Sequence, residues 1–473
     1  MSRIAHPAGP RHAEMEPPER PPPAPADVNA VDPAIWPRSA RRVRGALELG
    51  GIDARELARD FGTPLFALDE DDFRGRCRDF HEAFGPAAGV FYAAKAFCCR
   101  GVLRWVSEEG LGVDVCTGGE LEVALQAGVP PEMITLHGSN KLLSELERAV
   151  AVGVGHIVAD SLEEIARLTA IASRICAVNG RGPGDPAQRL RVLVRVTTGV
   201  EAAAHEFVAT AHDDQKFGFS LGSGAADEAV RQVLACPALE LAGLHSHIGS
   251  QIYDTAGFEV AAHRVLELAV RIRDQHGISI SELNLGGGFG IAYTEADDPA
   301  DIQVIARSLR DIMASQCRLA GLPLPRLIVE PGRAIAGPGT ITIYAVGTVK
   351  DVDGLRTYVS VDGGMSDNIR TALYDADYTC VLASRESAAP AMLCRLVGRH
   401  CESGDIVVRD AYLPGDLTSG DLIAVAATGA YCRSMASNYN HVPRPGVVAV
   451  RDGTARVLLR RETAADLLSL DAG

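Results

Sequence analysis

Eight short apolar runs, separated by longer segments with helical spacing, occupy residues 61–335 and constrain the fold more than any other feature of this sequence. Alternation of this kind is the order expected of βα units around a parallel sheet. Eight such units in succession predict an α/β fold of the closed (β/α)8 TIM-barrel type. The expected strands are Val90–Lys95, Leu111–Thr117, Ile134–Ser139, His156–Ser161, Arg191–Thr197, Leu241–Gly249, Glu282–Gly288 and Arg326–Gly332.

Chemically informative residues follow the apolar part of most of these runs. Active sites of such barrels lie at the C-terminal ends of the strands, whereas an open doubly wound sheet collects its site at one or two switch points. Contributions from most of the strand ends therefore favour the barrel. The residues at these ends are Lys95, Asp114, His137, Arg195, His247, Gly286–Gly288 and Glu330.

The pattern changes after residue 335 to strands without long helices, which predicts a C-terminal all-β domain over residues 336–473. The pair Asp452-Gly453, between two alternating runs, predicts a tight hairpin. Residues 31–60 precede the barrel, and we expect them to pack with this β domain. The expected strands are Thr340–Val349, Arg356–Val361, Ala391–Val397, Asp405–Val408, Asp421–Ala427 and Gly446–Arg461.

The composition suits a globular chain of two large units, with 473 residues of which 47% are hydrophobic and 23% are charged. A formal net charge of −15 argues against nucleic acid or an anionic membrane as a partner, and it favours small-molecule chemistry. The 11 cysteines form neither a CxxC pair nor a His/Cys cluster. This spacing indicates reduced thiols and no metal site.

The first thirty residues hold eight of the 26 prolines and lack the apolar segment of a secretory signal. This composition predicts a disordered tail over residues 1–30. No apolar stretch reaches the roughly eighteen residues that a membrane-spanning helix needs, so we expect a cytoplasmic protein.

Lys95 ends an apolar run, where a charge is costly unless a partner or a reaction explains it. It is therefore a candidate Schiff-base lysine, and a strand-end lysine that reaches solvent is the alternative. The glycine-rich segment Gly286–Gly290 follows another strand and could present backbone N–H groups to a phosphate. A purely structural turn explains it equally well, but the spacing does not fit a dinucleotide fingerprint.

Two further motifs could contact the same cofactor as Lys95 and the glycine-rich segment. In His245–Ser250, one histidine could face an aromatic cofactor and Ser250 could contact the same phosphate. Glu330–Arg333 offers a carboxylate that would keep a heterocyclic nitrogen protonated and a guanidinium for an anion. An imine-forming lysine, a carboxylate for a ring nitrogen, a stacking imidazole and a phosphate loop together indicate pyridoxal 5′-phosphate.

These segments resemble the fold-type-III pyridoxal-phosphate-dependent decarboxylases, whose barrel is of the alanine racemase type, and among them most closely the diaminopimelate decarboxylases. The resemblance extends from about residue 35 to the C-terminus, and the motifs follow the order of the family. The matching segments are Phe91–Lys95, Gly112–Leu121, His245–Ser250, Gly286–Gly290, Glu330–Arg333, Val361–Asp367 and His400–Asp405.

The resemblance implies a role for each matching residue. Lys95 would form the imine with the cofactor, His247 would stack on its ring, and Glu330 would hold the ring nitrogen. Cys401 would be the proton donor, in an active site that the neighbouring subunit of a homodimer completes. The implied cofactor-binding residues are Lys95, His247, Ser250, Gly287, Gly288, Glu330, Pro331, Gly332, Arg333 and Tyr431. The implied substrate-binding residues are Arg333, Arg370, Tyr374, Glu402 and Tyr431.

A second group of charged residues is expected to support the cofactor site, with surface ion pairing as the alternative. The chain departs from the family pattern at Ser139 and within Glu201–Phe207, and we assign no role to Ser139, His205 or Glu206. The supporting residues are Asp114, Glu120, Arg195 and Lys216.

Arginine usage indicates the substrate class. Meso-diaminopimelate has an amino-acid group at each end, so its unreactive end presents a carboxylate that a guanidinium can bind with two hydrogen bonds. Arg333 and Arg370 would bind it, whereas an ornithine-type decarboxylase needs an acidic group for the distal ammonium. We therefore expect decarboxylation of meso-diaminopimelate to L-lysine and CO2, the last step of lysine biosynthesis. The alternatives are another basic-amino-acid or carboxylated-polyamine decarboxylase of this fold and a non-catalytic homologue.

Overall fold

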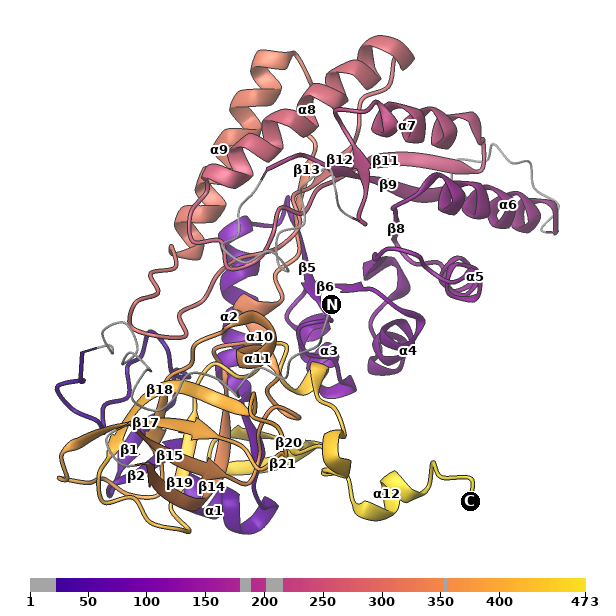
Figure 1. Ribbon diagram of the computed structural model, residues 1–473. Coiled ribbons are helices and arrows are strands. Elements are labelled where there is room, and N and C mark those ends of the chain that lie inside the picture. Colours follow the sequence, from indigo (N-terminus) through magenta and orange to yellow (C-terminus); the bar gives the residue numbers. More distant parts are fainter. Residues whose placement is uncertain (1–22, 179–188, 201–215, 353–354) are drawn as a thin grey trace, which may run out of the picture.

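The computed structural model describes residues 23–178, 189–200, 216–352 and 355–473. Figure 1 shows a barrel surrounded by helices and, at the opposite end of the molecule, a strand-rich body. The short helices α10 (Arg333–Ala336) and α11 (Arg370–Tyr374) lie where the two meet, and α12 (Ala464–Leu468) extends away from the strand-rich body.

The predicted (β/α)8 barrel is confirmed. Its strands pair in parallel in chain order, and the pairing of Ile328 with Gly89 closes the ring. A further short strand, β10 (Phe219–Ser220), pairs with one of them outside the ring. The barrel strands are β5 (Gly89–Ala93), β6 (Gly112–Val115), β7 (Ile134–Leu136), β8 (His156–Ala159), β9 (Leu190–Thr197), β11 (Leu239–His245), β12 (Glu282–Asn284) and β13 (Arg326–Val329).

The helix before β5 and the helices between the barrel strands begin and end at local sequence signals. Thr117 caps α4 by accepting the N–H of Glu120, and Gly128 ends the helix in the left-handed conformation. Asp301 caps α9 in the same way, by accepting the N–H of Gln303. The helices are α2 (Glu70–Phe84), α3 (Arg100–Glu108), α4 (Gly118–Ala127), α5 (Leu143–Val152), α6 (Leu162–Val178), α7 (Ala225–Ala235), α8 (Ala256–His276) and α9 (Ile302–Ala320).

The strand-rich body contains every strand predicted after residue 335. The hairpin is also confirmed, because Asp452 and Gly453 have positive φ between β20 and β21. The strands are β14 (Thr340–Val352), β15 (Arg356–Val361), β16 (Cys380–Leu382), β17 (Ala391–Val397), β18 (Ile406–Pro414), β19 (Leu422–Val425), β20 (Gly446–Arg451) and β21 (Thr454–Leu459).

One strand that follows residue 61, the predicted start of the barrel, belongs to the C-terminal sheet. The strand β4 (Leu65–Asp69) pairs with β14 and β20 and not with the barrel. All five of its residues are buried, so it sits inside the C-terminal sheet, although it precedes the barrel in the chain. A continuous apolar run fits a buried strand of either sheet. Only pairing with residues distant in the sequence therefore decides which sheet the strand joins.

The segment before β4 forms a small antiparallel sheet and one helix. Ile35, Trp36 and Leu47 share a buried cluster with Ile341 and Ile343 of β14, so this segment packs on the C-terminal sheet. None of the helices in the described ranges has the length and hydropathy to span a membrane. The elements of the segment are β1 (Arg41–Val43), β2 (Ala46–Leu49), β3 (Ile52–Asp53) and α1 (Ala54–Phe61).

Candidate active site

A cavity of about 220 Å³ lies at the C-terminal ends of the barrel strands. Its wall combines residues that follow the barrel strands with residues of the strand-rich body. The lining residues are Ala93, Lys95, His247, Ser250, Gly287, Gly288, Glu330, Gly332, Arg333, Arg370, Tyr374 and Tyr431. Most residues predicted for the cofactor and the substrate are therefore brought together in one place.

Lys95 follows β5, and the backbone on both sides of it is fixed. The N–H of Ala94 donates to the carbonyl of Asp114 on β6, and the carbonyl of Ala96 accepts the N–H of Tyr431. Burial lowers the pKa of the Lys95 amine, but Tyr431, Cys116, Asp114 and Glu330 together raise that pKa above its usual value. Without a ligand the amine is therefore protonated at neutral pH, and it must lose that proton to a base before it can attack a carbonyl carbon and form an imine.

The glycine run after β12 packs too closely against neighbouring backbone to admit side chains. A Cβ on Gly287 would lie 2.1 Å from the carbonyl oxygen of Glu330. A Cβ on Gly288, which has φ +101°, would lie 2.4 Å from the carbonyl oxygen of Gly249. These close approaches require glycine and form a cradle of backbone groups suited to a phosphate.

His247 stands beside this cradle. Its Nδ1 accepts the N–H of Gly287 at 3.2 Å, so the ring proton of the neutral imidazole is on Nε2. Burial lowers the pKa of His247 well below its usual value, which keeps the ring neutral. A neutral, partly buried imidazole at this position can stack on a flat heterocycle.

Glu330 is a buried carboxylate held by two donors. Asn284 Nδ2 donates to Oε1 at 2.6 Å, and His245 Nε2 lies 3.3 Å from Oε2. Burial alone would raise the pKa of Glu330, but His245, Lys95 and Asn284 lower it below the usual value. Glu330 is therefore ionised and can accept a hydrogen bond from a protonated ring nitrogen.

Asp114 and His137 lie behind Glu330. Arg195 Nη1 approaches His137 Nε2 at 3.0 Å, and because a guanidinium only donates, the ring proton of His137 is on Nδ1. That nitrogen is 3.5 Å from an oxygen of Asp114 and 3.8 Å from one of Glu330. Burial and the charge of Glu330 raise the pKa of Asp114 well above its usual value, so the pKa values of the two acids shift in opposite directions.

The His137, His245 and Glu330 side chains place three potential metal-ligand atoms within 4.8 Å of one another. Arg195, however, donates to His137 at 3.0 Å and supplies a positive charge where a cation would bind. The sequence predicted no metal site. The geometry fits a charged hydrogen-bond network behind the cavity better than a metal site.

Two buried arginines complete the wall. Arg333 donates from Nη1 to the hydroxyl of Tyr293 at 2.6 Å and from Nη2 to Ser250 Oγ at 2.8 Å. Arg370 donates from Nη1 to the hydroxyl of Tyr378 at 2.5 Å. Within the described part of the chain, neither guanidinium has a carboxylate within ion-pair distance, and the Nε of each has no hydrogen-bond partner. Two buried cations without counter-ions predict anionic ligands.

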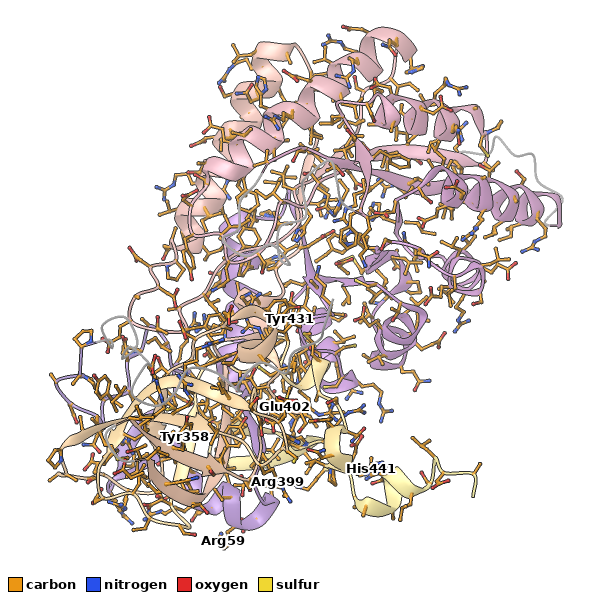
Figure 2. The ribbon with its side chains drawn as sticks, viewed as in Figure 1. Arg59, Tyr358, Arg399, Glu402, Tyr431 and His441 are labelled. Atoms are coloured by element: carbon orange, nitrogen blue, oxygen red, sulfur yellow. The ribbon has the colours of Figure 1, made fainter. Side chains whose placement is uncertain are left out.

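Cys401 and Glu402 do not line this cavity. Both are exposed, and the backbone N–H of Cys401 donates to the side chain of Asn440. In Figure 2, Glu402 is labelled on the strand-rich body next to Arg399, below Tyr431 in the view. The cavity of one chain is therefore built without the residue predicted to donate the proton.

The other predicted residues are placed around the cavity. Pro331 is buried beside it and accepts the N–H of Ala93 through its carbonyl. Glu120 accepts the N–H of Cys116 at 2.7 Å, and Lys216 lies over the ring of Phe217. His205 and Glu206 lie outside the described residues, and Ser139 is half-buried.

Sequence reasoning missed Tyr293 and Tyr378, which bind the two arginines. Tyr293 comes three residues after the glycine-rich segment, so its position next to the predicted phosphate loop was the available signal. Tyr378 follows Arg370 by eight residues and gave no signal, because only the folded chain brings its hydroxyl to the guanidinium.

Comparisons with known proteins agree with this geometry. Residues 70–337 match the family model described as pyridoxal-dependent decarboxylase, pyridoxal binding domain. A diaminopimelate decarboxylase of Mycobacterium tuberculosis is 58% identical over 448 residues, which cover 93% of this chain and 98% of that protein. The chain belongs to the diaminopimelate decarboxylase family.

More distant members of the family cover the same extent. A diaminopimelate decarboxylase of Bacillus subtilis is 43% identical over 436 residues, covering 92% of this chain and 97% of that one. The crystal structure of a diaminopimelate decarboxylase from M. jannaschii in complex with L-lysine has a TM-score of 0.84 and 29% identity. It covers 92% of this chain and 98% of that chain, so the barrel and the strand-rich body both have counterparts.

Proposed function

We propose that this protein is a pyridoxal-phosphate-dependent carboxy-lyase that converts meso-diaminopimelate to L-lysine and CO2. The observation that carries the proposal is the pair of buried guanidinium groups, Arg333 and Arg370, in one cavity with Lys95 and Glu330. A cofactor phosphate and a substrate carboxylate are the two anions that these groups can bind. A diamine-forming substrate would offer an ammonium in place of the second anion.

The residues present fit pyridoxal phosphate. Gly287, Gly288 and Ser250 would hold its phosphate, because backbone packs too closely at the two glycines to admit side chains. Segment Glu330–Arg333 would lie along the cofactor. When bound, the cofactor supplies a pyridinium ring that accepts the electron pair left at the α-carbon as CO2 departs.

The protein's own groups then have separate tasks. Lys95 would hold the cofactor through its side-chain amine until the amine of the substrate takes its place. Glu330 is held ionised by Asn284 and His245 and keeps the proton on the ring nitrogen. His247 excludes water from one face of the ring, and Arg370 with Tyr374 and Tyr431 orients the distal end of the substrate.

A proton must reach the α-carbon after CO2 leaves, and we propose that Cys401 of a second subunit supplies it. Cys401 and Glu402 are exposed in the single chain and absent from the lining of its own cavity. A second copy that placed its Cys401 and Glu402 at the cavity mouth would complete the site. This assembly is a homodimer with shared active sites.

The first test uses the purified holoprotein and meso-diaminopimelate. We expect release of CO2 and formation of L-lysine, together with the visible absorption band of a lysine-bound cofactor. Lys95→Ala should remove the band and lower turnover by at least about a thousandfold, because the covalent attachment is lost. Lys350→Ala, which changes an exposed lysine of β14, is the matched control and should keep both. Turnover and absorption that survive Lys95→Ala would refute the proposal.

A substrate panel separates this reaction from that of a diamine-forming enzyme. CO2 release is measured with meso-diaminopimelate, ornithine, lysine and arginine at matched concentrations. The uncompensated charges of Arg333 and Arg370 predict preference for the substrate with two carboxylates by at least about a hundredfold. Preference for ornithine or lysine would instead support a decarboxylase of basic amino acids.

A further inference from the structure

Tyr293 lies between the two arginines of the cavity. Its hydroxyl accepts a hydrogen bond from Arg333 Nη1 at 2.6 Å, and the Cζ of Arg370 lies 4.8 Å from the centre of its ring. The Cζ of Arg333 is 5.8 Å from the same ring. One phenol therefore contacts both guanidinium groups, with its oxygen for one and its face for the other.

The backbone of Tyr293 is fixed on both sides. Its N–H donates to Asp297 Oδ2 at 3.0 Å, and its carbonyl accepts the hydroxyl of Thr379 at 2.8 Å. The side chain is 5% exposed, and its ring meets that of Tyr378 edge to face at 5.2 Å between centroids. Tyr293 is thus a rigid support and not a mobile lid.

Tyr378 makes the corresponding contact on the far side of Arg370. Its hydroxyl accepts from Arg370 Nη1 and lies 3.5 Å from the buried thiol of Cys432. Burial raises the pKa of Tyr378 well above its usual value, so the hydroxyl stays neutral beside the guanidinium. Both arginines are therefore held by phenols rather than by carboxylates.

The chemical consequence concerns charge. A carboxylate would orient an arginine but would also neutralise it, whereas a neutral phenol orients it and leaves the positive charge for a ligand. Two guanidinium groups in one cavity also repel each other, and the contact of Arg370 with the face of the Tyr293 ring offsets part of that cost. The arrangement holds two charged donors in place before the substrate arrives.

We propose that Tyr293 is a positioning residue that sets the specificity of the site for a substrate with a second carboxylate. This inference rests on the proposed function and extends it, because it names the group that keeps Arg370 and Arg333 aligned and charged. Tyr293 acts through the arginines and touches no reacting atom.

The test compares Tyr293→Phe with Tyr293→Leu in the holoenzyme. Phenylalanine keeps the ring face for Arg370 and removes the oxygen that Arg333 uses, and leucine removes both. We expect KM for meso-diaminopimelate to rise about 5-fold in the first variant and about 50-fold in the second, with kcat within about 3-fold of wild type. Tyr358→Phe, in strand β15 of the C-terminal sheet, is the matched control and should change neither constant.

Two inhibitors show whether the effect comes through the carboxylate. L-lysine keeps the carboxylate of the distal end, and cadaverine has the same carbon chain with two amines and no carboxylate. The two variants should weaken inhibition by L-lysine in parallel with KM and leave inhibition by cadaverine unchanged. Equal weakening of both would overturn the proposal, because it would indicate a general loss of packing.

The remaining outcomes are also decisive. Failure of the wild-type protein to release CO2 from meso-diaminopimelate would refute the proposed function itself. An active wild type whose KM is unaffected by Tyr293→Leu would refute only the role of Tyr293. A fall in kcat with unchanged KM, or loss of the cofactor absorption band, would assign Tyr293 to the cofactor and would likewise overturn the inference.

Discussion

Two buried acids in the barrel interior have pKa values that shift in opposite directions, and their neighbours explain the difference. Glu330 receives donors from Asn284 and His245, which hold its pKa below the usual value despite burial. Asp114 has no hydrogen-bond partner on either carboxylate oxygen among the described residues, and burial raises its pKa. Burial acts on both acids, and the charges and hydrogen-bond donors around Glu330 reverse its effect there, whereas the charge of Glu330 adds to it at Asp114.

A third buried acid predicts a measurable pH dependence. Burial raises the pKa of Asp367 to about 7 from the ordinary 3.8, although Tyr344 and the N–H of Gly364 donate to it. Between these values the native state binds a proton that the unfolded state has released, so the free energy of unfolding falls as pH rises from about 4 to 7. Above about pH 7 this contribution is constant.

Asp367→Asn removes this titration. The difference in unfolding free energy, wild type minus variant, should fall by up to about 4 kcal/mol between pH 4 and pH 7, measured by urea unfolding of the holoprotein. Asp274→Asn, at an exposed carboxylate near the end of α8, is the control and should follow the wild type. Parallel curves for wild type and Asp367→Asn would contradict the assignment.

At the scale of elements, local sequence specified most of the strands but not all of their partners. The eight barrel strands and the Asp452-Gly453 hairpin each carry a pattern that a short window contains. Strand β4 carries an equally clear apolar pattern, yet it pairs with β14 and β20 across almost the whole chain. Strand β16 (Cys380–Leu382) was missed, because three residues are too few for a periodicity.

The glycine-rich turn after β12 predicts how a single substitution changes the affinity for the cofactor. Gly288→Ala places a Cβ 2.4 Å from the carbonyl oxygen of Gly249 at a φ that favours glycine, so the phosphate cradle must deform. We expect the dissociation constant of the cofactor, measured by absorbance titration, to rise at least about tenfold.

The matched control for this variant is Gly277→Ala. Gly277 ends α8 with φ +67° and has nothing within 4 Å of an added Cβ. Alanine there is therefore strained by the positive φ, as at Gly288, but meets no clash. It should lower the free energy of unfolding by about 1 kcal/mol and leave cofactor affinity unchanged. Equal effects of the two variants on affinity would show that the cradle at Gly288 does not bind the phosphate.

At the scale of the whole molecule, the cavity joins two bodies that neither completes alone. Lys95, His247 and Glu330 come from the barrel, and Arg370, Tyr374 and Tyr431 come from the strand-rich body. Tyr431 adopts φ +60°, which is unusual for tyrosine, and its N–H donates to the carbonyl of Ala96. The turn that carries Tyr431 therefore places the strand-rich body against the segment of Lys95, and the strained backbone of Tyr431 is the conformational cost.

The proposed sharing of sites predicts complementation between two inactive variants. Lys95→Ala and Cys401→Ala each lack a different part of the site, so each homodimer should be nearly inactive. Each mixed dimer should contain one intact site and one site that lacks both groups, so the purified mixed dimer should recover about half of wild-type turnover. The subunits are co-expressed with different tags, and CO2 release from the purified mixed dimer is measured.

The control for this experiment is a mixture of Lys95→Ala with Lys95→Ala/Cys401→Ala, in which no intact site can form. That mixture should stay inactive. Activity of Cys401→Ala alone at the wild-type level would refute the role of Cys401. Absence of recovery in a verified mixed dimer would instead place Lys95 and Cys401 of one chain in the same site.

The sequence alone determined the barrel, the strand-rich body after it, and the residues that gather at the strand ends, because periodicity and strand-end chemistry are local properties. The folded chain decided three other features. It placed β4 in the C-terminal sheet, it shifted the pKa values of Asp114 and Glu330 in opposite directions, and it brought Tyr293 and Tyr378 to the two arginines. Each depends on partners far apart in sequence, and only long-range packing brings those partners into contact.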